Sequence, residues 1–347
     1  MDLDFHLRIA SLADEAQRLQ LDEVVICSQY NILALTGVNC DNAVLVIKPN
    51  TKNTAKFKVA FYTDFRYAPM VRRIAPMLDC RDLKRLKFSG RRIGYEPSIT
   101  HSMFLEFRAK APPRARFVDV SSVINYLRAI KSPEEISKIR AAEKLNCKIW
   151  EKASSLFRAG MTERDMARII KTMMIELGDG EAFPTIVCVG SNAAECHHEP
   201  DDTVWNGRES VLVDMGVKLD GVASDLTRNL VVRPSRLYSR VYSLVKEANE
   251  AAKAAARAGM TCKELDNIAR KIISDGGFGK CFGHSLGHGV GYEVHETPTL
   301  SPKSPLVLEP GMIVTIEPGI YLEGNLGVRI EDLVLITEDG CEVLSDY

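Results

Sequence analysis

The chain has 347 residues, a formal net charge of −1, 46% hydrophobic and 26% charged residues. This length and composition are typical of a globular protein of about two domains. The near-neutral charge argues against a nucleic-acid partner, because binding to phosphate backbones requires a concentration of basic residues.

The cysteines and the apolar segments indicate the compartment. Nine cysteines are scattered from Cys27 to Cys341 without a CxxC pair, which favours free thiols in a reducing environment. The first ten residues lack the basic-then-apolar order of a signal peptide, and no apolar run approaches the ~20 residues of a membrane-spanning helix. We therefore expect a cytoplasmic protein without a membrane partner.

The first 125 residues are predicted to form an α/β unit. Apolar residues at helical spacing, from Phe5 to Leu19, predict an opening helix. An exposed turn is expected at 52–56. Strand-like runs, separated by Lys- and Arg-rich helical stretches, are expected at 23–27, 42–49, 58–63, 92–97 and 116–121.

A domain boundary is predicted near residues 128–132, which gives domains 1–128 and 129–347. Ser132, Pro133 and Glu135 form a helix start with an N-cap, a proline in the first turn and a capping box. Gly160 is the predicted end of this helix.

The second domain contains an internal repeat. The sequence Ala-Gly-Met-Thr at 159–162 recurs 99 residues later at 258–261, and each copy leads into an amphipathic segment. Asp214 then corresponds to Glu317, and Asp225 to Glu331. Because the period is too long for a solenoid, we expect two similar α/β halves that face each other across a cleft.

Each half carries two acidic residues on a predicted hairpin. A hairpin centred between Leu219 and Asp220 places Asp214 opposite Asp225. A turn centred on Gly324 places Glu317 opposite Glu331, although a bulge would shift either register by one residue. Carboxylates that close repel each other unless a cation lies between them.

His288, flanked by Gly287 and Gly289, is the candidate neutral ligand beside these carboxylates. Four carboxylates balance the charge of two divalent cations, and such a site suits Mn²⁺ or Co²⁺, with Zn²⁺ also possible. Two such metals can share one hydroxide as the nucleophile and polarise a carbonyl oxygen. On these residues alone, solvated carboxylates on strand faces remain an equal alternative.

At these motifs the chain resembles the pita-bread metallopeptidases, in the branch of aminopeptidase P and prolidase. The resemblance implies an α/β (α+β) fold, with an RNase H-like, creatinase-type α/β domain followed by a pita-bread domain with an internal two-fold repeat. The N-terminal domain matches more loosely, through 30–37 and 62–67. The C-terminal matches are FPTIVCVGSNAAECHHEP (183–200), VDMGVKLDGVASDLTR (213–228), FGHSLGHGVGYEVHETP (282–298), IVTIEPGIY (313–321) and GVRIED (327–332).

The resemblance implies a role for each ligand. Asp214 would chelate one metal, His288 and Glu317 would bind the other, and Asp225 and Glu331 would bridge both. Glu317 would also act as a general acid and base, accepting a proton from the bridging water and passing it to the leaving amine.

The resemblance also implies a substrate pocket. His295 would hydrogen-bond the substrate carbonyl or the oxyanion, and His284 would line the pocket. Arg329 would hold a carboxylate by a salt link and is also placed among the substrate-binding residues. Tyr292 stands where leucine is common and would shape the pocket wall.

The remaining pocket histidine is His197 or His198, with the alignment around Asn192 favouring His197. The family often has Pro-His where this chain has Cys196-His197. The loop that contains Arg66 reaches the partner subunit's active site in relatives, which implies a homodimer in which Arg66 binds a substrate terminus. The alternative is a surface loop with an internal Asp–Arg pair.

The implied function is hydrolysis of the bond between an N-terminal residue and proline in small peptides, by a Xaa-Pro aminopeptidase or a prolidase with two divalent ions, Mn²⁺ first. The proline preference comes from the resemblance alone. Methionine aminopeptidase activity and a non-catalytic peptide-binding role are the alternatives. The additional N-terminal domain argues against the first, and the complete ligand set argues against the second.

Overall fold

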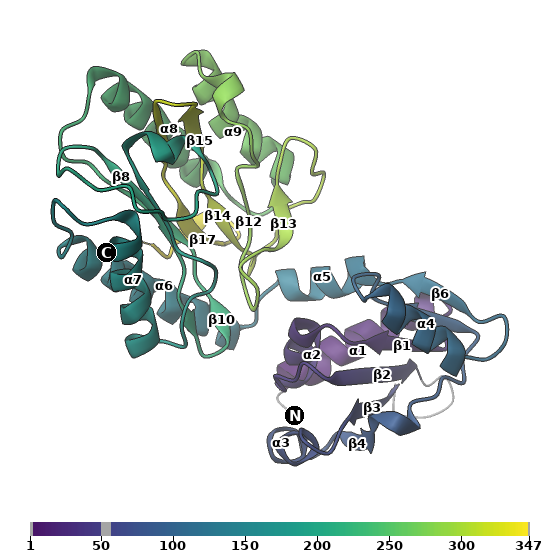
Figure 1. Ribbon diagram of the computed structural model, residues 1–347. Coiled ribbons are helices and arrows are strands. Elements are labelled where there is room, and N and C mark those ends of the chain that lie inside the picture. The colour runs from purple at the N-terminus through teal and green to yellow at the C-terminus, as the bar shows by residue number, and fades with distance from the viewer. Residues whose placement is uncertain (1–2, 50–56, 346–347) are drawn as a thin grey trace. The chain divides into compact units, whose positions relative to one another are not determined.

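The computed structural model describes residues 3–49 and 57–345 of the chain. It divides into two compact units, Met1–Arg128 and Ala129–Tyr347 (Figure 1). The turn expected at 52–56 lies outside the described residues. Within the described ranges, no helix is both long and apolar enough to cross a membrane.

The N-terminal unit is built on a mixed six-stranded sheet with the order β4-β3-β2-β1-β5-β6. All five expected strands are present. The sequence did not predict β4, because its residues are Asp-Cys-Arg-Asp at the sheet edge and three of the four are exposed. The strands are β1 (Glu23–Ile26), β2 (Ala43–Pro49), β3 (Phe57–Thr63), β4 (Asp79–Asp82), β5 (Arg92–Tyr95) and β6 (Arg116–Asp119).

Both faces of this sheet are covered by hydrophobic clusters. Alternate residues of each strand point to opposite sides, so neighbouring residues belong to different clusters. Val24 and Ile26 belong to one hydrophobic cluster and Val25 to another. The expected opening helix is α1. The helices of the unit are α1 (Leu3–Arg18), α2 (Gln29–Thr36), α3 (Ala68–Ile74), α4 (His101–Lys110) and α5 (Ser121–Ala129).

The C-terminal unit opens with α6 (Pro133–Ser154), and the predicted capping box between Ser132 and Glu135 is present. The prediction that this helix ends at Gly160 is wrong. The helix stops at Ser154, and Phe157 turns into the core, where it is 4% exposed. Gly160, with a φ of 96°, lies instead in the turn that leads to the next helix.

The internal repeat is visible in the hydrogen bonds that open each half. Thr162 caps α7 (Glu163–Leu177) and Thr261 caps α9 (Cys262–Asp275), each through a capping box. The same two threonines form isolated bridges to Val204 and Val307. The two copies of Ala-Gly-Met-Thr therefore occupy equivalent places.

Each half pairs helices with a sheet. Helices α6 and α7 pack on the sheet β11-β8-β7, and α8 (Arg236–Ala255) and α9 pack on the sheet β13-β12-β14-β17-β18 (Figure 1). Two short ribbons, β9–β10 and β15–β16, complete the unit. The strands are β7 (Ile186–Val189), β8 (Val211–Met215), β9 (Lys218–Leu219), β10 (Val222–Ala223), β11 (Leu226–Leu230), β12 (Gly287–Gly289), β13 (Glu296–Leu300), β14 (Ile313–Ile316), β15 (Gly319–Leu322), β16 (Leu326–Arg329), β17 (Asp332–Ile336) and β18 (Cys341–Val343).

Candidate metal centre

The first hairpin has a register different from the expected one. Strands β8 and β11 pair Asp214 with Thr227, so the prediction that Asp214 lies opposite Asp225 is wrong. The turn residues are Asp220 and Gly221, with φ angles of 50° and 79°. An Asp-Gly turn of this kind favours positive φ at both positions, and it moves the hairpin centre by one residue. Asp225 consequently lies diagonally from Asp214 on the same face.

The second hairpin has the expected register. Ile316 pairs with Asp332 at the end of β14–β17, and the ribbon β15–β16 continues the same register beyond it. Glu317 and Glu331, which lie between these two stretches, are therefore opposite each other, as predicted.

His288 on β12 points one ring nitrogen at two of these carboxylates. Its Nδ1 lies 3.2 Å from the carbonyl oxygen of Gly289 and donates to it. Burial, together with His295, lowers the pKa of His288 to about 4, so the ring is neutral and Nε2 carries a lone pair. That Nε2 lies 3.6 Å from Asp225 Oδ2 and 3.3 Å from Glu317 Oε1. The two carboxylate oxygens and the lone pair of His288 Nε2 repel one another at these distances, so a cation or a proton must lie between them.

The carboxylates show the same requirement. Burial, with a smaller contribution from nearby acidic groups, raises the pKa of Asp225, Glu317 and Glu331, and that of Glu317 reaches about 8 although Arg329 lowers it. Asp214 Oδ1 is buried and, among the described residues, has no hydrogen-bond partner. Ligand atoms of Asp225, His288 and Glu331 lie within 4.8 Å of one another. This donor set fits divalent metal ions, which would relieve the repulsion and satisfy the free oxygen.

Arg329 supports the centre from β16. Its Nη2 donates to Asp214 Oδ2 at 2.6 Å, and its Nε donates to Thr227 Oγ1 at 3.0 Å. Thr227 in turn donates to Glu331 Oε2 at 2.7 Å. Of the two roles expected for Arg329, these contacts correspond to the support of carboxylates, since its guanidinium is committed to protein groups.

Tyr321 is a site residue that the sequence reasoning missed. Its hydroxyl accepts a hydrogen bond of 2.9 Å from Arg329 Nη1 and lies 2.9 Å from His284 Nε2. The signal was available, because β15 pairs Gly319 with Arg329 and Tyr321 follows two residues later on the same face.

Two predicted pocket histidines, His284 and His295, contact this network or the ligand His288. His284 is neutral, since burial lowers its pKa to about 4, and its Nδ1 lies 2.8 Å from the carbonyl oxygen of Ser285. The His295 ring lies 4.3 Å from that of His288, and its pKa is lowered, first by burial and also by His197. His197 is exposed, while His198 is bonded to Glu163 behind it.

Two further predicted residues, Tyr292 and Arg66, have other neighbours. Tyr292 is half-buried and packs against the hydrophobic cluster that contains Val290. Arg66 belongs to the N-terminal unit, is 61% exposed and forms an ion pair of 2.6 Å with Asp64. The internal Asp–Arg pair weighed as an alternative is therefore present.

Comparisons with known proteins agree with this architecture. The model described as metallopeptidase family M24 matches residues 137–338, and that of the creatinase/prolidase N-terminal domain matches 8–130. An uncharacterised peptidase of Staphylococcus aureus strain MSSA476 is 34% identical, over 98% of this chain and 99% of that protein. The solved Xaa-Pro dipeptidase from Bacillus anthracis is 29% identical with a TM-score of 0.92, covering 99% of this chain and 98% of that one. The prolidase from Pyrococcus furiosus is 33% identical with a TM-score of 0.90, covering 96% and 99%.

Proposed function

Because the chain belongs to metallopeptidase family M24, with a creatinase/prolidase-type N-terminal domain, we propose that it is a dinuclear exopeptidase that cleaves Xaa-Pro bonds. The observation that carries this proposal is the convergence of His288 Nε2 with the carboxylates of Asp225 and Glu317 beside the unsatisfied Oδ1 of Asp214. The proline preference rests on the likeness to proteins described as a Xaa-Pro dipeptidase and a prolidase.

The five ligands would share two divalent ions, with Mn²⁺ expected and Co²⁺ or Zn²⁺ as alternatives. Asp214 would hold one ion, His288 and Glu317 the other, and Asp225 and Glu331 both. Bound ions would supply an activated water and polarise the scissile carbonyl. The protein's own contribution is to fix these side chains, as Arg329 does for Asp214.

Glu317 would carry the proton in this reaction. We assign it the transfer from the attacking water to the leaving proline nitrogen, a general acid–base role. Thr315 Oγ1 lies 3.3 Å from Glu317 Oε1 and restrains that oxygen.

The histidines would bind and orient the peptide. His295, exposed beside the His288 ring, would donate to the carbonyl oxygen as negative charge develops there. His284, held by Tyr321, and His197 would line the pocket, with Tyr292 at its wall. Arg66 would bind a substrate terminus in a homodimer.

A cleavage panel tests the proposal. Protein loaded with Mn²⁺ would be assayed on Ala-Pro, Ala-Pro-Ala, Met-Ala and Ala-Ala, with metal content measured in the same preparation. We expect two metals per chain and hydrolysis of the proline peptides alone. Preference for Ala-Pro indicates a dipeptidase, and preference for Ala-Pro-Ala an aminopeptidase. Release of Met from Met-Ala without action on Ala-Pro would contradict the proposal.

A further inference from the structure

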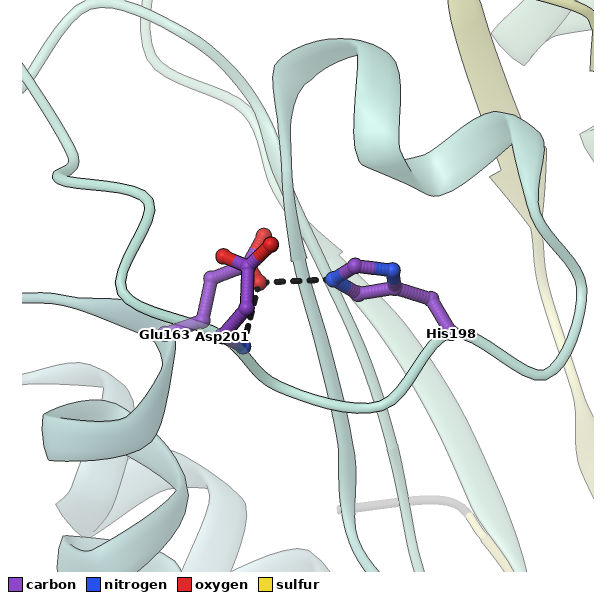
Figure 2. A group of neighbouring side chains, drawn as sticks. All are labelled: Glu163, His198 and Asp201. Atoms are coloured by element: carbon purple, nitrogen blue, oxygen red, sulfur yellow. Dashed lines mark hydrogen bonds and ion pairs between the residues drawn. The ribbon is translucent and has the colours of Figure 1, made fainter.

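A buried carboxylate–imidazole pair lies outside the metal centre, between Glu163 at the start of α7 and His198 (Figure 2). Glu163 has no exposed surface. Its Oε1 accepts from Val189 N at 2.6 Å and Asn192 Nδ2 at 2.9 Å. Its Oε2 accepts from His198 Nε2 at 2.7 Å and Asp201 N at 3.0 Å. The donors are Val189 at the end of β7 and three residues of the following segment 190–203, which carries His197.

This cluster is an anchor for the segment. Glu163, His198 and Asp201 do offer ligand atoms within 4.8 Å of one another. However, the Glu163 carboxylate already accepts four N–H groups, and Asp201 Oδ1 accepts from Thr203 N at 2.7 Å. A metal would have to displace these donors, so the hydrogen bonds account for the buried carboxylate without an ion.

The second half of the repeat lacks this anchor, although its backbone is equivalent. Cys262, also fully buried, stands 99 residues after Glu163 at the start of α9. Glu163 N donates to Thr203 O at 3.2 Å, and Cys262 N donates to Leu306 O at 2.8 Å. The backbone arrangement therefore forms without a buried carboxylate, which points to a function of Glu163 that is particular to the first half.

On its other side the same segment contacts β16, the strand that carries Arg329. The carbonyl oxygen of Cys196 lies 3.5 Å from Arg329 Nη1. At Gly327 a Cβ atom would come within 1.7 Å of the carbonyl oxygen of Ala193, so only glycine permits this approach. His197 lies between the two attachments. Its neighbour Cys196 contacts Arg329 Nη1, which also donates to Tyr321, the partner of His284. His197 is therefore next in sequence to a residue that contacts the network of the pocket histidine His284.

We propose that His198, held by Glu163, is a positioning residue that fixes the segment 190–203 so that His197 faces the substrate pocket. This inference rests on the proposed function. It assigns separate roles to the two adjacent histidines, one to the anchor and the other to the pocket.

Kinetics on Ala-Pro with the Mn²⁺-loaded protein test the assignment. We expect His198→Ala to raise KM about tenfold with at most a threefold change in kcat, and His198→Gln, whose Nε2 can still donate to Glu163, to restore KM. The double variant His197→Ala/His198→Ala should match His197→Ala, because the anchor acts through His197. Asp202→Ala is the matched control, since it removes an exposed ion pair with Arg164 from the same segment.

Three results would overturn the proposal. The first is an unchanged KM in His198→Ala, and the second is an equal rise of KM in Asp202→Ala. The third is a KM in the double variant that equals the product of the two single effects. A thermal shift on adding Zn²⁺ to Mn²⁺-loaded protein that His198→Ala abolishes would instead identify a metal site. Amide hydrogen exchange across 190–203 measures how firmly the segment is held and does not depend on catalytic activity. We expect faster exchange in His198→Ala and unchanged exchange in Asp202→Ala. A wild-type protein inactive on both Ala-Pro and Ala-Pro-Ala would therefore refute the proposed function while leaving the anchor testable.

Discussion

Arg329 Nη2 donates a hydrogen bond of 2.6 Å to Asp214 Oδ2, and this bond joins the second half of the C-terminal unit to the first. Both side chains are largely buried, with 4% and 15% of their surfaces exposed. The guanidinium holds one oxygen of Asp214 and leaves the other, Oδ1, free for a ligand. One ion pair thus orients a candidate metal ligand and connects the two halves.

Replacing this arginine should weaken metal binding. We expect Arg329→Met to reduce Mn²⁺ affinity about 10- to 100-fold, the usual effect of removing a group that orients a ligand. Arg329→Lys should not restore it, because an ammonium cannot contact Asp214, Thr227 and Tyr321 together. Mn²⁺ titration by calorimetry measures the change. Arg140→Met, which breaks an exposed pair with Glu342, is the control, and an equal loss there would contradict the role.

Removing the Tyr321 hydroxyl should reduce activity. Tyr321→Phe deprives Arg329 and His284 of a shared partner, and we expect a stability loss of about 1–3 kcal/mol together with a lower kcat/KM. Tyr238→Phe is the matched control, because it also removes a buried tyrosine hydroxyl, one that bonds to Asn229 at 3.4 Å. Denaturation and Ala-Pro hydrolysis would be compared, and equal loss of activity in both variants would rule out a role for Tyr321 at the site.

Removing the metals should lower the melting temperature. Four clustered carboxylates then face one another, and the binding contribution, about 2.7 kcal/mol at a metal concentration of 100 Kd, is lost. Glu331→Gln removes one of these charges, so the difference between metal-loaded and chelated protein should shrink. Differential scanning fluorimetry with and without a chelator gives both values. A wild-type melting temperature unaffected by exhaustive chelation would contradict the metal assignment.

The anchor histidine should make stability depend on pH. Burial lowers the pKa of His198, but the hydrogen bond and charge of Glu163, with smaller contributions from Glu195 and Asp201, raise it above 6.5 overall. A raised pKa means that the folded protein holds the proton more tightly than the unfolded chain. The stabilisation is therefore complete below about pH 6.5 and is lost as pH rises through the folded pKa.

Melting temperatures of wild type and His198→Gln measure this dependence. The advantage of the wild type should be larger at pH 6 than at pH 9, because only histidine gains a charge beside Glu163. A difference that stays constant between these pH values would show that the ring contributes only as a neutral donor.

The comparison of the two hairpins shows what the sequence could predict. The register around Gly324 followed from the symmetry of its turn, whereas Asp220-Gly221 formed a tighter turn and moved Asp225 to a diagonal position. The repeated acidic pairs and His288 named residues that converge in the structure, although on these patterns alone solvated carboxylates were an equal alternative. Tyr321 and Glu163 were missed because their importance comes from partners distant in sequence, Arg329 and His198, which only the folded chain brings together.

Glu163 and Cys262 occupy equivalent starting positions of their helices but differ in chemistry. In an assembly of two identical half-length chains, one residue would have to serve both places, with either two buried carboxylates or none. Joining the halves in a single polypeptide removes that constraint. One half is then free to hold the segment 190–203 through a buried carboxylate while the other keeps a buried cysteine, so the covalent link permits different chemistry at equivalent backbone positions.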